Sequence, residues 1–140
     1  MGKILKGILS FIAIVITFTI ATCCGKTCSN VSIERKKTTN LSYEVKLMNK
    51  ELPKKFDNMI LERIELHENR ELRYCFTVTN SNIHPNQAQI DIIKQQMIER
   101  TRNATNLQKL KEYGITLAYE YNNTNGVRLA LIKIYPQDYQ

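Results

Sequence analysis

The sequence predicts an α+β domain in which an antiparallel sheet of four to five strands packs on one main helix, preceded by an N-terminal hydrophobic helix. Three observations support this prediction. An apolar run covers residues 8–20, apolar and polar residues alternate over 72–79 and 115–121, and apolar residues recur at steps of three and four between 87 and 110. The predicted element order is β-β-β-α-β-β, a two-layer arrangement.

The N-terminus has the features of a targeting segment. Lys3 and Lys6 precede the apolar run, and residues 19–21 end in a small-x-small pattern that suits cleavage before Thr22. An uncleaved anchor is the alternative, because residues 4–24 approach the about 20 apolar residues that span a bilayer, and Lys6 could snorkel to the interface. Residues 1–24 are therefore predicted as a signal peptide or transmembrane anchor. Either one places the rest of the chain outside the cytoplasm or on a membrane surface.

Four cysteines occur, at positions 23, 24, 28 and 75. Cys23 and Cys24 lie where a bacterial lipoprotein carries its acylated cysteine, and juxtamembrane cysteines are also palmitoylation sites. The simple alternative is two small apolar residues that close the hydrophobic segment. Cys28 and Cys75 could form a disulfide in an oxidising compartment. A buried free thiol is the favoured alternative for Cys75, which lies in the middle of a predicted strand.

The remaining chain reads as a polar tether over 25–40, followed by a single α+β domain over 41–140. The formal net charge is +7, and the densest basic clusters are residues 35–37 and 54–55. Such clusters are usually solvated, although they could contact anionic headgroups. Aromatic residues do not interleave with a basic stripe, so the sequence predicts no nucleic-acid binding.

The first half of the domain is predicted to contain three strands. Residues 42–48 alternate Tyr43, Val45 and Leu47 with polar residues, which indicates a short strand. Residues 60–66 and 72–79 flank a polar turn and predict an antiparallel hairpin, with the Leu72 side of its second strand on the core.

The second half is predicted to contain the helix and a last hairpin. Asn86 is a candidate N-cap, residues 102–106 have low helix propensity and predict a kink or break, and Gly114 suits a left-handed C-cap. Residues 115–121 and 127–135 then form two strands, joined by a turn that ends in Asn-Gly.

One pattern extends from residue 52 to the end of the chain. It comprises Leu52-Pro53, Asp57, Leu72-x-Tyr74, a helix with Leu107 and Leu110, Gly114-Ile115, Tyr119-x-Tyr121 and Asn125-Gly126. In this pattern the chain resembles a loosely defined group of small exported or membrane-anchored bacterial α+β domains. The resemblance implies an exported domain of this fold and no particular activity.

The sequence offers few residues for chemistry. His67 lies beside Glu65 and Glu68 and could form a general-base pair, but solvated loop histidines are the favoured interpretation for both His67 and His84. No nucleophile elbow or glycine-rich phosphate loop is present. We therefore expect no cofactor, no metal site and no enzymatic activity.

Four tyrosines are predicted to lie on the sheet. Tyr74, Tyr119, Tyr121 and Tyr135 could form a partner-binding surface, because a tyrosine ring buries area while its hydroxyl keeps a hydrogen bond. The alternative is that they fill the core. The core is favoured, because they share the alternation phase of the apolar residues on their strands.

The sequence thus favours a non-enzymatic binding or scaffolding domain of the cell envelope. The expected partners are the membrane, through the N-terminal segment, and an envelope protein, as for small pilot or chaperone lipoproteins. An immunity or inhibitor protein that blocks a toxin or hydrolase in the same compartment is the alternative. An exposed sheet edge could also support a homodimer through strand addition.

Overall fold

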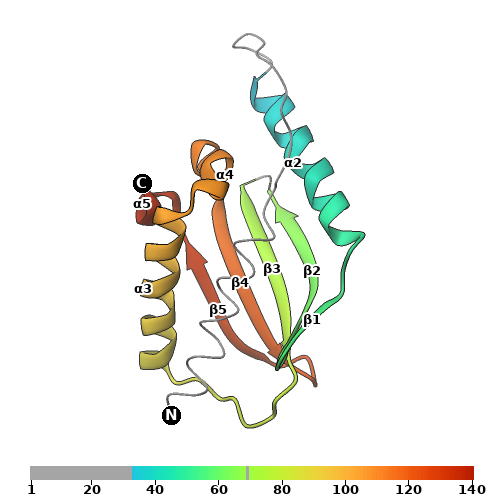
Figure 1. Cartoon of the computed structure of the whole chain (residues 1–140), viewed down its shortest axis with the longest axis vertical. Helices are drawn as coiled ribbons and strands as arrows, with labels where there is room; N and C mark the ends of the chain where they lie inside the picture. The colour runs from blue at the N-terminus through green and yellow to red at the C-terminus, as the bar shows by residue number, and fades with distance from the viewer. Residues whose placement is uncertain (1–32, 69) are drawn as a thin grey trace.

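The computed structural model describes residues 33–68 and 70–140, with side chains described from residue 41 onward. Five strands form one sheet in the order β1-β2-β3-β4-β5. The strands are β1 (Lys54–Phe56), β2 (Met59–His67), β3 (Glu71–Val78), β4 (Thr116–Asn123) and β5 (Arg128–Ile134). The helices are α2 (Ile33–Asn49), α3 (Gln87–Asn103), the short 3-10 turn η1 (Thr105–Leu107), α4 (Gln108–Glu112) and α5 (Pro136–Tyr139) (Figure 1).

The predicted α+β class and the order β-β-β-α-β-β are confirmed, with two corrections. The sheet is mixed rather than antiparallel, because β3 and β4 pair in parallel while the other neighbours are antiparallel. A parallel pair requires a long crossover, and here the chain from residue 79 to residue 115 carries α3 and α4 between the two strands.

The second correction concerns residues 42–48, which form part of α2 and not a strand. Leu41 and Val45 lie one helical turn apart and are buried, whereas Tyr43 and Leu47 face outward. The alternation of apolar and polar residues over 42–48 therefore arises from residues on opposite sides of a helix. The first strand is instead β1, and the domain has two long helices rather than one. α2 begins at Ile33, inside the predicted tether, whose first residues lie outside the described part of the chain, as does the predicted N-terminal hydrophobic helix.

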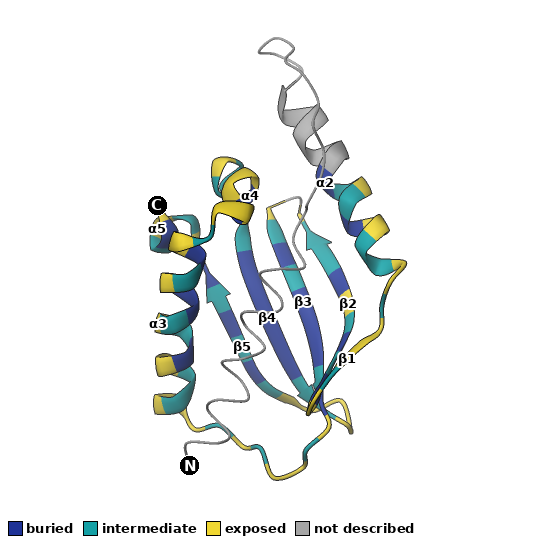
Figure 2. Cartoon of the chain, in the orientation of Figure 1, coloured by how far each residue is buried: buried dark blue, intermediate teal, exposed yellow. Residues whose placement is uncertain are grey.

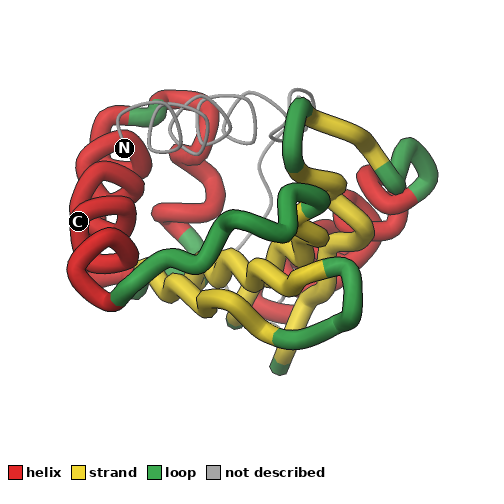
Figure 3. Tube along the Cα trace, turned by 90° about the horizontal axis from the view of Figure 1, so that it is seen from below, coloured by secondary structure: helices red, strands yellow, loops and turns green. Residues whose placement is uncertain are grey.

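The core lies on one face of the sheet. Alternate residues of the strands point into it, among them Leu72, Phe76, Leu117 and Ile134, each at most 2% exposed. The buried residues are concentrated on the middle strands β3 and β4 (Figure 2). α2 packs against β2 and α3 against β5, so that the two long helices lie beside opposite edges of the sheet (Figure 3). Between them, Tyr74 stacks on Tyr119 and Phe76 on Tyr121, with ring centroids 5.2 Å apart in both pairs.

Local signals set the ends of α3 as predicted. Asn86 Oδ1 accepts a hydrogen bond from the backbone N–H of Gln89 at 2.9 Å, and Gln89 Oε1 accepts one from the N–H of Asn86 at 2.9 Å. The helix ends at Asn103, within the predicted break. Gly114, which follows α4 rather than α3, has a φ of 62°, the left-handed conformation expected after a helix end.

One side chain closes the outer edge of β2. The Asn49 amide at the end of α2 donates from Nδ2 to the Ile64 carbonyl at 2.7 Å and accepts from the Ile64 N–H at 2.9 Å. Asn49 thereby occupies the position of a neighbouring strand where β1 no longer pairs, which protects an edge that would otherwise be open to strand addition.

Replacing Asn49 by Ala should lower the free energy of unfolding by about 1–3 kcal/mol, because both backbone groups of Ile64 lose their partner. Urea unfolding followed by circular dichroism would measure this loss. Asn82→Ala, in the exposed loop after β3, is the control and should change stability by at most about 0.5 kcal/mol. Equal stability of Asn49→Ala and wild type would contradict the proposed edge contact.

Candidate functional site

The sheet face opposite the core is charged. Because side chains alternate along a strand, Glu71, Arg73 and Cys75 of β3 point away from the face that holds Leu72 and Tyr74. Glu120 on β4, and Arg128 and Lys133 on β5, join them through ion pairs. We call this set, together with Arg63, Glu65 and His67 of β2, the charged face.

Two glutamates organise the charged face. Glu71 accepts from Arg73 Nη2 at 2.6 Å and from Lys133 Nζ at 2.8 Å. Glu120 accepts from Arg128 Nη2 at 3.1 Å and from Arg73 Nη1 at 3.4 Å. Arg73 therefore bridges two adjacent strands through two carboxylates, and the glutamate side chains are only 17% and 11% exposed. A network of this kind fixes side-chain geometry better than isolated surface pairs do.

The environment keeps these carboxylates ionised. Burial would raise the pKa of Glu71, but hydrogen bonds from Lys133 and Arg73 hold it below its usual value. A hydrogen bond from Asn122 and the charges of Arg128 and Arg73 lower the pKa of Glu120 against the opposing effect of burial. The surface consequently presents fixed charges at neutral pH.

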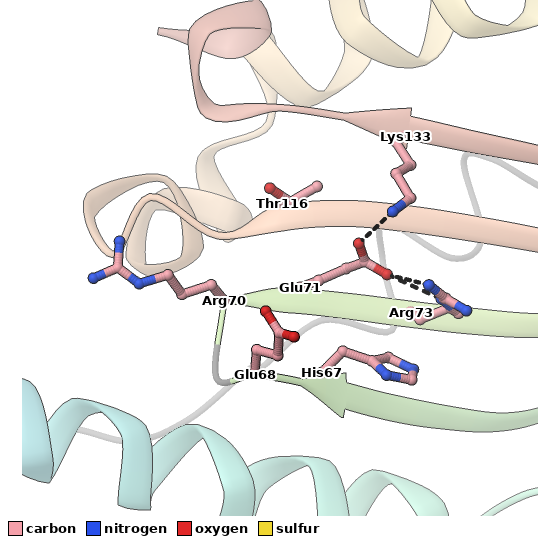
Figure 4. A pocket seen from close by; sticks show the side chains of 7 residues that line it. All are labelled: His67, Glu68, Arg70, Glu71, Arg73, Thr116 and Lys133. Atoms are coloured by element: carbon pink, nitrogen blue, oxygen red, sulfur yellow. Dashed lines mark hydrogen bonds and ion pairs between the residues drawn. The ribbon is translucent and has the colours of Figure 1, made fainter.

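A pocket of about 410 Å³ opens at the end of the charged face where β2 turns into β3. It is lined by His67, Glu68, Arg70, Glu71, Arg73, Thr116 and Lys133 (Figure 4). Arg70 is exposed and forms no ion pair within the described part of the chain. Three cations, Arg70, Arg73 and Lys133, outnumber the two carboxylates, Glu68 and Glu71, in the lining, so the pocket is suited to an acidic group of a ligand.

The histidines do not form a shared site. His67 Nε2 lies 2.7 Å from Glu65 Oε2, so the predicted histidine–carboxylate pair forms with Glu65. His67 pairs with Glu71 at the start of β3, whereas His84 is exposed in the loop that follows the other end of that strand. Among the described residues no cluster of three or more histidines, cysteines or carboxylates could hold a metal ion.

Cys75 is a free thiol that is only 1% exposed. Burial raises its pKa to about 11; the charges of Glu65 and Glu120 raise it further, whereas those of Arg63 and Arg73 lower it. The predicted alternative of a buried free thiol therefore describes Cys75. Its predicted disulfide partner Cys28, and the predicted lipidation sites Cys23 and Cys24, lie outside the described residues.

The four predicted tyrosines separate into two groups. Tyr74, Tyr119 and Tyr121 are between 4% and 9% exposed and belong to the core, so the surface alternative is wrong for these three. Tyr135 is 41% exposed, with Lys94 Nζ 6.0 Å from its ring centroid. The pairing of β3 with β4 stacks Tyr74 on Tyr119, and Tyr121 on Phe76. Burial of the rings contributes more free energy than hydration of their hydroxyl groups would.

The sequence alone does not predict the charged face. Arg73 and Lys133 alternate with apolar residues, which signals only that they point away from the core. Their convergence on Glu71 depends on the strand order, which brings β3, β4 and β5 together.

The fold is shared with known structures. A pilotin of the type 2 secretion system of Vibrio vulnificus, EpsS, matches with a TM-score of 0.61 at 13% identity, over 79% of this chain and 98% of that one. A Pseudomonas aeruginosa protein described as secreted matches with a TM-score of 0.65 at 13% identity, over 81% and 100%. The type 2 secretion pilotin AspS of Vibrio cholerae matches with a TM-score of 0.53 at 16% identity, over 75% and 97%.

The sequence comparisons add no relative. No family model matches the chain, and no curated protein does. No helix within residues 33–68 and 70–140 is long and apolar enough to cross a membrane.

Because of the charged face, we expect the free energy of unfolding to decrease at acid pH. Because the folded state lowers the pKa of Glu65, Glu71 and Glu120, their contribution is complete above the unfolded-state pKa of about 4.3 and is lost as pH falls through the folded values. Glu71→Gln should lower the free energy of unfolding by about 1–2 kcal/mol at pH 7 and reduce the loss between pH 5 and pH 2. Urea titrations at each pH would measure both effects, and exposed Glu99→Gln is the matched control. An unchanged pH profile in Glu71→Gln would contradict the network.

Cys75 should react slowly with iodoacetamide while the protein is folded, because the thiol is buried and remains protonated at neutral pH. Unfolding in urea should raise the rate at least about tenfold, since local opening then no longer limits access. Mass spectrometry of the peptide that contains Cys75 would follow the reaction. Equal rates in the two states would show that the site is open.

Proposed function

We propose that this chain is a non-enzymatic binding domain of the bacterial cell envelope. Its N-terminal segment would hold it at a membrane, and the domain would face the periplasm or the exterior and contact a protein of an envelope assembly. The observation that carries the proposal is the likeness to two pilotins of type 2 secretion systems, which extends over 98% and 97% of their chains. A comparable assembly role would need a stable platform and a contact surface rather than a catalytic centre.

The charged face is the contact surface that we propose. Its carboxylates and cations are held in fixed positions by ion pairs, and fixed charges select partners more than they add affinity. At the pocket, the cations Arg70, Arg73 and Lys133 outnumber the carboxylates Glu68 and Glu71, and Lys133 is paired with Glu71. The expected partner therefore presents an acidic side chain or a terminal carboxylate to this end of the sheet.

Deletion of the gene in its native host should reduce the abundance or assembly of one envelope protein, which quantitative proteomics of the membrane fraction would identify. A plasmid copy should restore that protein. A copy with Arg70→Glu and Lys133→Glu should not restore it, because both substitutions place negative charge against the acidic group of the partner.

The matched control is Lys55→Glu, which makes the same type of change at an exposed position on β1, outside the charged face. Full complementation by the double variant would show that the charged face is not the contact surface. An unchanged membrane proteome after deletion would contradict the assembly role itself.

A further inference from the structure

We propose that the outward side of α2 rests on the surface of an anionic membrane. The inference rests on the proposed function, because it requires a chain held at a membrane. Its basis is a small patch formed by Tyr43, Lys46 and Leu47 of α2 and by Lys50, one residue past the end of the helix, which we call the outer α2 patch. Two large side chains in it face solvent, with Tyr43 62% and Leu47 40% exposed.

The outer α2 patch is distinct from the stripe that holds the helix on the domain. Leu41 and Val45 are buried, and α2 packs on β2. Tyr43 and Leu47 are also one turn apart, so they form a contiguous apolar spot on the other side of the helix. A helix with a second apolar stripe has more hydrophobic surface than its own domain covers.

Lysines surround this apolar spot. Lys46 and Lys50 are exposed and form no ion pair within the described part of the chain. Glu51 is the exposed acidic neighbour, and partly buried Glu44 lies between the two stripes. The basic residues 35–37 also lie near the start of α2. An apolar strip bordered by lysines is the pattern of helices that lie in a membrane interface, where the lysine stems snorkel and a tyrosine ring sits at headgroup level.

The position of α2 in the chain favours a membrane as the occupant. Residues 21–32 separate the apolar run at 8–20 from the start of α2. Even fully extended, these residues span at most about 40 Å, so α2 is the first described element within reach of the bilayer. A second copy is less suited to the outer α2 patch, because it would bring the lysines of both copies together.

The test uses the absence of tryptophan from the sequence. Tyr43→Trp in the full chain introduces a single fluorophore at the centre of the patch. The variant is reconstituted into vesicles of phosphatidylcholine and phosphatidylglycerol that carry bromine on the acyl chains. We expect a blue shift of the emission and loss of intensity through bromine quenching. The matched control is Val127→Trp, because Val127 is 59% exposed in the turn between β4 and β5; its emission should not change.

The charge requirement is tested separately. Lys46→Glu with Lys50→Glu in the Tyr43→Trp background should reduce the shift and the quenching, and so should added salt. Vesicles of phosphatidylcholine alone should give a smaller effect than vesicles that contain phosphatidylglycerol.

Three outcomes would overturn the inference. If the chain floats with the vesicles while Trp at position 43 behaves like Trp at position 127, the contact is absent and the proposed function is unaffected. If the chain does not float at all, the membrane anchoring of the proposed function fails together with the inference. A blue shift that grows with protein concentration without lipid would assign the outer α2 patch to a second copy.

Discussion

The parallel pairing of β3 with β4 is the constraint on which the rest of the structure depends. Its register sets Tyr74 beside Tyr119 and Phe76 beside Tyr121 on the core face, where both pairs stack with centroids 5.2 Å apart. Two parallel strands cannot be joined by a tight turn. The connection must leave one end of the sheet and return to the other, and this requirement places α3 beside β5, where its apolar side closes the core.

The alternation of side chains along the paired strands gives the two faces of the sheet different roles. One face buries aromatic and aliphatic side chains and supplies most of the stability. The other holds Glu71 and Glu120 at positions where Arg73 can bond to both. Single surface ion pairs contribute little to the free energy of folding. The main effect of this network is therefore to hold the charged side chains in fixed positions. A domain of this design offers a partner a rigid charged surface without exposing its core.

α2 combines three functions in one helix. Leu41 and Val45 pack it onto the domain, Asn49 closes the edge of β2, and Tyr43 and Leu47 face away from the sheet. The edge contact bears on assembly, because an open strand edge invites pairing with other chains. Because Asn49 occupies the backbone groups of Ile64, this stretch of β2 does not offer a free edge for strand addition.

The sequence by itself determined the elements with local signals. Alternation defines the β2–β3 hairpin, Asn86 marks the start of α3, and the Gly114 conformation follows from its place after a helix. For residues 42–48 the sequence predicts a strand where the structure has a helix, since three alternating apolar residues fit a strand and two sides of a helix equally well. Only the tertiary structure decided that β3 and β4 run parallel, because strand pairing depends on contacts between residues far apart in the chain. For the same reason the convergence of Arg73, Lys133 and Glu71 was decided by the strand order, and no local pattern in the sequence records it.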